Sequence, residues 1–478
     1  MLRILFSVFF TILIFFCYLI FNTARFERIP PDVELLFIKD KQTYAFNSPF
    51  FNPVNTIKLH SFDSSGLLSY HIQIAKADGE ILLSKDEVLT KRQDRIDVFL
   101  PQLIDYNLNN GDEIIYTVSV RDWSNANFFR GNTTTINKHL TISTELPKIQ
   151  IISTSERITY GGSALIAFHI EDLPIYGNMP QSKIYNVHIY NGRHSFTAFP
   201  YRNKYGKTVY LCLVAWTLDS SFFDAEIHIT DMAMNKQIFK IPLDVNINSI
   251  RHKRNIITSI NDNYFDRIIS RLDSAIVFPS NVISDVQKFQ FLNESLRNED
   301  NKSLVKFSKV FSNSISNQES SLIRFNNFVP VNFSNTSGRF GDMRTFNYHK
   351  ESIASNTRFG IDLLDSIGSN VISSNNATLG FAGKFSSYGN LIMLNHALGL
   401  SSVYANLQEI SNIEEPIKAP LVIGKVGNST ANLIDGIHFM LILQGHFINP
   451  RDWINKDWVD ININEVLSVA DNFGMKVF

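Results

Sequence analysis

The sequence has few cysteines, few charged residues and no excess of either charge sign, and each shortage excludes a class of protein. Only Cys17 and Cys212 occur among 478 residues, which excludes a disulfide scaffold and a cysteine-rich zinc or iron–sulfur module. The 44 Lys and Arg residues are balanced by 45 Asp and Glu residues, which argues against a nucleic-acid binder. Fifteen prolines and 22 glycines are too few for a collagen-like or low-complexity chain. The whole sequence is 44% apolar and 12% aromatic, and its length is enough for two to four folded domains.

The one long hydrophobic run covers residues 4–21 and contains no charged residue. As a helix it would be roughly 27 Å long, just enough to span the hydrocarbon core of a membrane. Cleaved signal peptides usually have a shorter apolar region, of about 7–15 residues, and a small-x-small exit. The exit here, residues 22–26 (NTARF), is a poor cleavage site. We therefore predict that residues 1–24 form an uncleaved signal anchor, with a cleaved signal peptide and a buried helix of a soluble domain as alternatives.

Two β-rich modules are predicted next, at residues 29–145 and 146–250. The opening of the first, residues 31–36 (PDVELL), recurs about 110 residues later as residues 147–152 (PKIQII). Near the end of each module an alternating strand leads into a turn, which begins at Asp122 in the first and at Asp231 in the second. Such alternation is typical of antiparallel strands, so each module is predicted to resemble an immunoglobulin-like β-sandwich, with residues 114–120 and 133–142 as a hairpin. We expect Asp122 and Asp231 to be turn residues that cap local backbone, and not calcium ligands. Cys212 is expected to be a small core residue.

A helical segment is predicted at residues 255–316. In its first helix, apolar residues from Tyr264 to Leu272 repeat at helical spacing after possible caps at residues 261–263. Pro279 ends that helix, and Ser280 is a possible cap for the next, which runs through Leu296. A third, weaker helical stretch covers residues 304–311, and residues 312–321, rich in Ser, Asn and Gln, are predicted to be a linker. We interpret these helices as packing elements between domains.

A final β domain is predicted at residues 325–460, with a C-terminal tail at residues 461–478. Its sequence predicts short strands separated by turns that contain glycine and asparagine. The motifs along it are Gly360-Ile361-Asp362, residues 388–396 (YGNLIMLNH), residues 404–407 (YANL), residues 424–427 (GKVG), residues 436–439 (GIHF) and Asn449-Pro450.

The order of these motifs resembles that of the lysostaphin/LytM-type zinc peptidases, which cut peptide cross-links in the bacterial cell wall. The family pattern is H-x-G-x-D, Y-G-N followed by a histidine, Y-A-H-L, G-x-x-G, H-L-H-F and N-P. The resemblance covers residues 325–460, and residues 291–297 (FLNESLR) and 453–458 are also similar to membrane-anchored periplasmic members. It implies a mainly β fold in which a LytM-type antiparallel β domain follows the helical linker and the two sandwich modules.

The resemblance also implies which positions would hold zinc, and most of them differ here. Asp362 and His438 match two metal ligands, but Arg358 stands at the third. The two further family histidines, beside the metal-bound water, are replaced by Asn406 and Gly436. A guanidinium is always charged and has no lone pair to donate, so we expect Arg358 to pair with Asp362. A catalytic zinc needs three protein ligands and a water molecule. We therefore expect no bound cofactor and no catalytic residue, and regard Asp362 and His438 as a remnant pair.

From this we predict an extracytoplasmic pseudopeptidase, a single-pass protein of the bacterial inner membrane with the bulk of the chain in the periplasm. Its groove, lined by Arg358, Tyr388, Asn390, Asn406 and Gly436, would be widened by the loss of two histidines and could bind peptidoglycan or a partner. The resemblance implies a wall amidase or an active LytM-family endopeptidase as the partner.

Two alternatives stay open. In the first, the chain is an active zinc endopeptidase that cleaves peptidoglycan cross-links with Asp362, His438 and a substitute ligand; His349, His396 and His446 are the histidines considered for that role. In the second, the β-modules are the binding part and the LytM-like domain has no role of its own.

Overall fold

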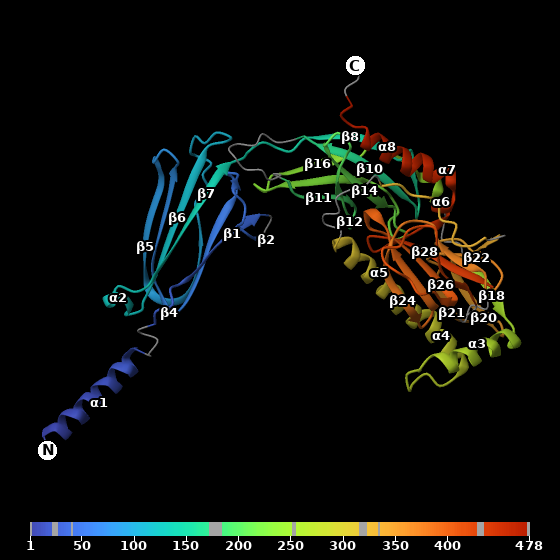
Figure 1. Ribbon diagram of the computed structural model, residues 1–478, viewed down its shortest axis with the longest axis horizontal. Coiled ribbons are helices and arrows are strands. Elements are labelled where there is room, and N and C mark those ends of the chain that lie inside the picture. Colours follow the sequence, from blue (N-terminus) through green and yellow to red (C-terminus); the bar gives the residue numbers. More distant parts are fainter. Residues whose placement is uncertain are drawn as a thin grey trace. The chain divides into compact units, whose positions relative to one another are not determined.

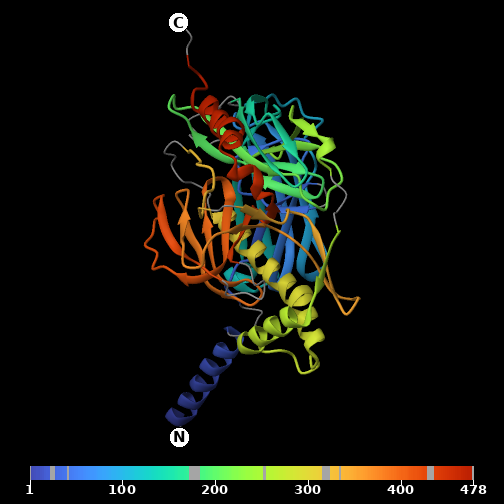
Figure 2. The same cartoon turned by 90° about the vertical axis from the view of Figure 1, so that its right-hand side faces the viewer.

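The computed structural model describes residues 2–21, 27–39, 42–171, 184–250, 255–314, 323–332, 335–427 and 435–475 (Figures 1 and 2). Strands predominate, so the prediction of a mainly β fold is confirmed. The chain divides into two compact units. The first comprises Met1–Pro147, Asp172–Asn186 and Ile229–Gln237, and the second comprises Lys148–Glu171, Val187–His228 and Ile238–Phe478.

The predicted signal anchor corresponds to helix α1, which covers Leu2–Phe21. Within the described part of the chain, no helix combines the length and the hydropathy that crossing a membrane requires. The cleavage-site prediction at residues 22–26 falls outside the described residues. The anchor at residues 1–24 therefore stays a prediction.

The first β-module forms one seven-stranded sheet in the order β2-β1-β4-β6-β7-β3, with β5 paired to β4. The predicted hairpin of residues 114–120 and 133–142 is confirmed, since β6 pairs antiparallel with β7. A single sheet arises because the long strand β4 pairs with β1 through its first half and with β6 through its second half, with a register shift between Phe62 and Leu67. The elements are β1 (Asp32–Lys39), β2 (Gln42–Ala45), β3 (Phe50–Phe51), β4 (Thr56–Lys76), β5 (Ile81–Phe99), β6 (Glu113–Asp122), α2 (Ala126–Phe129) and β7 (Thr133–Ile142).

The predicted turn aspartates do cap local backbone. Asp122 Oδ1 accepts hydrogen bonds from the backbone N–H groups of Ser124 (3.0 Å) and Asn132 (2.7 Å), and Asp231 Oδ1 accepts one from Asn235 (2.7 Å). In each case the asparagine side-chain amide donates one hydrogen bond to the aspartate carboxylate. It donates another to a backbone carbonyl in the segment just before the first strand of a module. Asn132 reaches the Glu27 carbonyl (2.9 Å), and Asn235 reaches that of Ser143 (3.0 Å). The repeated pattern supports the duplication that the sequence indicated.

The second β-module contains two four-stranded sheets, with the orders β13-β14-β10-β8 and β12-β11-β15-β16, together with the parallel pair β17-β9. This two-sheet arrangement agrees with a sandwich, whereas the immunoglobulin-like character of either module stays a prediction. Cys212 lies fully buried on β14, as expected. The elements are β8 (Ile149–Thr154), β9 (Arg157–Thr159), β10 (Ser163–Ile170), β11 (Ile184–Asn191), β12 (His194–Thr197), β13 (Phe199–Arg202), β14 (Thr208–Ala215), β15 (Ala225–Asp231), β16 (Lys236–Lys240), β17 (Asp244–Asn246) and the 3₁₀ turn η2 (Ile247–Ser249).

The predicted helical segment differs from the structure in two places. It begins with a strand, β18 (Asn255–Ile260), which pairs parallel with β20, because a segment rich in β-branched residues suits an edge strand better than a helix. The cap of the second helix is Ser284 and not Ser280, since Ser284 forms a capping box with Gln287. The second and third predicted helices are continuous across a π-helical turn. The elements are α3 (Asp262–Ala275), α4 (Asp285–Phe291), η3 (Leu292–Leu296) and α5 (Arg297–Ser314).

The C-terminal β domain is built on a nine-stranded sheet whose main order is β19-β22-β28-β26-β25-β24. Helix α5 contacts β24, β26 and β28, and Leu304 of α5 lies in the core formed with Met440 and Ile442 (Figures 1 and 2). A separate three-stranded sheet, β18-β20-β21, packs against α4. The elements are β19 (Asn335–Ser337), β20 (Met343–Tyr348), β21 (Glu351–Thr357), β22 (Ile361–Leu364), β23 (Asn370–Ser373), β24 (Thr378–Phe385), β25 (Gly389–Asn395), η4 (Ala397–Gly399), β26 (Leu400–Ile410), β27 (Leu421–Val426), β28 (Gly436–Leu443) and β29 (His446–Ile448).

Within the predicted C-terminal tail, the described residues 461–475 are mostly helical and pack on the second β-module, as does the neighbouring Trp453. Helix α8 contacts β8 and β10 (Figure 1). Tyr201 Oη donates a hydrogen bond to Asp471 Oδ1 (2.6 Å), and Trp453 Nε1 donates one to Ser163 Oγ (3.0 Å). This contact joins residues far apart along the chain, so no local pattern predicts it. The elements are α6 (Pro450–Ile454), α7 (Lys456–Val459), η5 (Asp460–Asn464) and α8 (Glu465–Asp471).

Candidate functional site

Asp362 and His438 lie directly opposite each other on two paired strands. Asp362 is on β22 and His438 is on β28, and the antiparallel register places their Cα atoms as partners. His438 Nδ1 and Asp362 Oδ1 share a hydrogen bond of 2.7 Å. The two side chains are 2% and 6% exposed, so each uses the other to satisfy a buried polar atom. The tertiary fold thus brings together the remnant pair that the sequence singled out.

Arg358 completes a buried three-residue network. Its Nη1 forms an ion pair with Asp362 Oδ2, as the sequence predicted, and lies 3.4 Å from the carbonyl oxygen of Ser337. The guanidinium packs over Gly338, where a Cβ atom would lie 2.3 Å from Nη1. Both carboxylate oxygens of Asp362 are therefore engaged, one by His438 and one by Arg358.

The charges around Asp362 oppose a second cation at this place. Burial by itself raises the pKa of Asp362, but the hydrogen bond from His438 and the charge and hydrogen bond of Arg358 outweigh it and leave the pKa below its usual range. Burial lowers the pKa of His438, which makes the neutral ring the favoured form. Burial, followed by the charges of Arg358 and Arg297, lowers the pKa of Arg344 to about 9. One carboxylate thus lies in the field of three guanidinium groups.

Tyr388, which directly precedes β25, packs against this network and is held in place by residues of helix α5. The Tyr388 ring stacks on the His438 ring, with centroids 5.7 Å apart and an interplanar angle of 10°. Its hydroxyl donates a hydrogen bond to Asn301 Oδ1 (2.7 Å), and the Arg297 guanidinium lies 5.2 Å from the ring centroid. Asp300 Oδ2 accepts a hydrogen bond from the Ser387 backbone N–H group (2.7 Å). Sequence reasoning missed these α5 contacts, although Arg297 ends the segment that carried part of the family resemblance.

Asn406 and Gly436 have structural explanations. The Asn406 side-chain amide donates to the carbonyl oxygens of Gly427 (2.9 Å) and Gly436 (2.7 Å), which ties two loops together. Gly436 has φ +155°, and a Cβ atom there would lie 2.4 Å from the carbonyl oxygen of Leu363. Asn390 donates to the carbonyl oxygens of Leu407 (3.1 Å) and Gln408 (3.2 Å).

The geometry differs from the expected widened groove. Arg358, Tyr388 and Asn406 are 8%, 2% and 3% exposed, and Gly436 is buried. The missing histidine side chain leaves no space at position 436, because the backbone of β22 approaches it. A peptide could reach these side chains only after α5 or the adjoining loops moved.

The three histidines considered as substitute ligands each have other contacts. His349 Nε2 lies 2.9 Å from Asp262 Oδ1 at the surface, and His446 stacks edge-on against His194. His396 is buried between the carbonyl oxygen of Asn376 (2.9 Å) and Ser402 Oγ (2.7 Å). Among the described residues, no group of three or more His, Cys, Asp or Glu side chains is arranged to hold a metal ion. The donor set around Asp362 therefore does not fit a catalytic zinc, which needs three lone-pair donors.

His396 makes the stability of this domain sensitive to acid. Burial lowers the pKa of His396 to about 4, well below the value of about 6.5 for an unfolded histidine. Because the unfolded chain binds the proton more tightly, the stabilisation is complete above pH 6.5 and is lost as the pH falls towards 4. We expect a loss of about 3 kcal/mol over that interval. Urea denaturation of the full chain between pH 8 and pH 4 measures it, and His396→Gln should flatten the profile; an equally steep profile for this variant would contradict the assignment.

Comparison with known proteins identifies the domain that carries this network. Residues 356–450 match the family model "Peptidase family M23". The chain contains an M23 peptidase domain. Relatives include the "DD-carboxypeptidase/endopeptidase Mpg" proteins of Neisseria meningitidis and Neisseria gonorrhoeae, each 29% identical over 126 residues. That alignment covers 26% of this chain and 28% of theirs, so this chain spans less than a third of the length of these relatives.

The chain is also similar to solved structures. A peptidase M23 protein from Pseudomonas aeruginosa is 12% identical, covering 62% of this chain and 95% of its own, with a TM-score of 0.34. Helicobacter pylori Csd3 is 11% identical, covering 81% of this chain and 75% of its own, with a TM-score of 0.24. Both scores are below 0.5, so the family assignment of the M23 domain depends on the sequence matches.

Proposed function

We propose that this chain is an extracytoplasmic cell-wall protein whose M23 domain acts by binding and not by catalysis. In this proposal the domain is a pseudopeptidase that binds peptidoglycan or regulates a wall hydrolase, such as an amidase or an active M23 endopeptidase. Residues 1–24 anchor it in the inner membrane of a bacterium, with the remaining chain in the periplasm. The M23 match supports the association with the wall, because members of this family act on peptidoglycan.

One observation carries the loss of catalysis: Arg358 occupies one oxygen of Asp362, and His438 occupies the other. A divalent ion would have to displace the permanently charged guanidinium of Arg358 from the carboxylate of Asp362, which is buried. Without such an ion no water molecule is acidified and no carbonyl group is polarised. Asn406 cannot serve as a base, because the nitrogen lone pair of a carboxamide is delocalised and its N–H groups donate to two backbone carbonyl groups.

We expect purified protein to release no new muropeptides from peptidoglycan, even with added zinc. Losing a single stabilising donor typically costs about 10²–10³ in rate, and three family positions differ here, so the rate should be at least about 10³-fold below that of an active M23 enzyme. Chromatography with mass spectrometry of the soluble fragments measures this, and sedimentation with insoluble sacculi measures binding. Cleavage that is abolished by Asp362→Ala would overturn the proposal.

The retention of Asp362 and His438 side by side favours one second candidate, an active zinc endopeptidase. It requires α5 or Arg358 to move so that a third ligand can join the pair. The two candidates differ in metal content. Elemental analysis of protein purified without added metal should give close to zero zinc per chain if the domain is a pseudopeptidase, and about one zinc per chain if the second candidate is right.

A further inference from the structure

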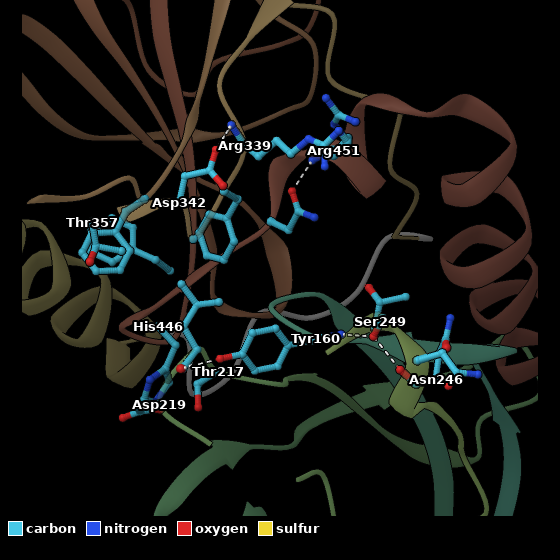
Figure 3. Close-up of a pocket in the computed structure, with 18 of the residues that line it drawn as sticks. Tyr160, Thr217, Asp219, Asn246, Ser249, Arg339, Asp342, Thr357, His446 and Arg451 are labelled. Carbon is cyan, nitrogen blue, oxygen red and sulfur yellow. Dashed lines mark hydrogen bonds between the residues drawn. The ribbon is translucent and has the colours of Figure 1, made fainter. Parts of the chain in front are cut away.

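A large cavity lies in the second unit, away from the Asp362 network. Its volume is about 990 Å³, at the upper end of the size of small-molecule sites. The second β-module contributes Tyr160 and the segments around Thr217 and Asn246, and the M23 domain contributes Arg339, Thr357 and the segment around His446 (Figure 3). Each of these segments belongs to the same compact unit. The cavity therefore exists only in the folded combination of the β-module with the M23 domain.

Strand alternation connects the cavity to the altered metal position. Thr357 and Phe359 line the cavity, whereas Arg358 between them points to Asp362. The Arg358 backbone holds the cavity loop in place, because its N–H group donates to the Asp342 carbonyl (2.9 Å) and its carbonyl accepts from Gly341 (2.9 Å). The network at Asp362 thus supports one wall of the cavity.

Two exposed arginines, Arg339 and Arg451, lie at one end of the cavity in Figure 3. Neither is in a salt bridge of 4 Å or less with a described residue, although the carboxylate of Asp452 lies within the electrostatic reach of Arg451. Asp219 lies at the opposite end and is already paired with Arg193 and His194. Asp342 accepts a hydrogen bond from the Arg339 backbone N–H group (3.3 Å). Two guanidinium groups at one end of the cavity, neither of them in a salt bridge, favour an anion there, and a carboxylate fits the fork-like geometry of a guanidinium.

The rest of the lining suits a ring with hydroxyl groups. Phe359 stacks on Phe447, with centroids 4.7 Å apart and an interplanar angle of 16°, which fixes a flat apolar surface in the wall. Tyr160 is held by a hydrogen bond from its hydroxyl to the Leu218 carbonyl (2.6 Å). Asn246, Asn248 and Ser249 add amide and hydroxyl groups along the side between the two ends. An aromatic face with amides nearby matches a sugar, which has an apolar C–H face and a polar rim.

We propose that this cavity binds an acidic amino sugar, with the sugar ring on the aromatic wall and its carboxylate at Arg339 and Arg451. That the sugar comes from the cell-wall glycan rests on the proposed function. That the cavity suits an acidic amino sugar rests only on the residues that line it. Because the carboxylate of this sugar is joined to the stem peptide by an amide bond in intact peptidoglycan, such a site would attach the chain to glycan from which the peptide has been removed, at a place separate from the covered Asp362 network.

N-Acetylmuramic acid and N-acetylglucosamine test this directly, because they share the sugar and the acetamide group and only the first carries a carboxylate. With the purified full chain, calorimetry or ligand-observed NMR should show N-acetylmuramic acid binding at about 1 mM or tighter, and N-acetylglucosamine at least tenfold more weakly. The double variant Arg339→Ala/Arg451→Ala should weaken N-acetylmuramic acid binding at least tenfold. Arg267→Ala, an exposed arginine on α3, should bind as the wild type does.

Failure to bind either sugar, or unchanged binding by the double variant with an unchanged melting temperature, would overturn the proposal. Equal binding of the two sugars would overturn the role of the arginines. Neither probe contains a peptide cross-link, so these results are independent of whether the M23 domain cleaves peptidoglycan. Peptidoglycan cleavage would overturn the pseudopeptidase proposal and leave the cavity assignment intact.

Discussion

A histidine introduced at position 436 is expected to destabilise the M23 domain without creating a peptidase. Gly436 has φ +155°, and any Cβ atom there would lie 2.4 Å from the carbonyl oxygen of Leu363, an atom of the backbone that cannot rotate away. Strain of this kind, added to displacement of β22 from β28, should cost about 3 kcal/mol or more. Because β22 carries Asp362, the substitution would also disturb the residue that a metal would need.

Gly436→Ala isolates the backbone effect, and Gly368→Ala is its matched control. Gly368 also has a positive φ, of +86°, and lies in the same domain, but nothing is within 4 Å of its Cβ position. Gly368→Ala should lower the free energy of unfolding by only about 1 kcal/mol. Chemical denaturation followed by tryptophan fluorescence compares the variants. Equal midpoints for the two alanine variants would show that the close approach at Gly436 does not constrain the fold.

Removal of the Asp362 carboxylate should be among the most destabilising single changes in the chain. Asp362→Leu would leave the Arg358 guanidinium, which is 8% exposed, without its carboxylate partner, and His438 without its hydrogen bond. Breaking a buried ion pair from one side typically costs about 3–5 kcal/mol. Replacement of both charges, in Arg358→Met/Asp362→Leu, should recover much of that loss, since no unpaired charge remains buried. The denaturant midpoints of the wild type, Arg358→Met, Asp362→Leu and the double variant complete a double-mutant cycle.

The pH dependence provides a second readout for the same carboxylate. The folded pKa of Asp362 lies below that of an unfolded aspartate, about 3.9, so its stabilisation is present above that value and is lost as the pH falls through the folded pKa. Lys456 and Asp460 form an exposed pair in the same unit and serve as the control, where Lys456→Met should leave the denaturant midpoint nearly unchanged, because solvent screens the pair. If Asp362→Leu costs no more than Lys456→Met, the buried network is not a major source of stability.

Features with a local cause could be predicted from the sequence. The hairpin of β6 and β7 follows from period-two alternation, and the turns at Asp122 and Asp231 follow from the ability of a short carboxylate to accept backbone hydrogen bonds. The pairing of Arg358 with Asp362 could also be expected, because an unpaired buried guanidinium is costly. The strand at residues 255–260 lies within the segment predicted to be helical and could not be predicted locally, because its pairing partner, β20, lies more than eighty residues further along the chain.

By itself, the sequence indicated an M23-like domain, and its resemblance to the family implied that three of five site positions differ, because residue identity fixes which atoms can donate a lone pair. Only the tertiary structure decided that these changes leave a filled site. Arg358 and His438 occupy the two oxygens of Asp362, α5 places Tyr388 over them, and the backbone of β22 closes the space at Gly436. The cavity with Arg339 and Arg451 likewise depends on loops from two domains. Such contacts join residues far apart along the chain, so they depend on how the elements pack and not on any local pattern.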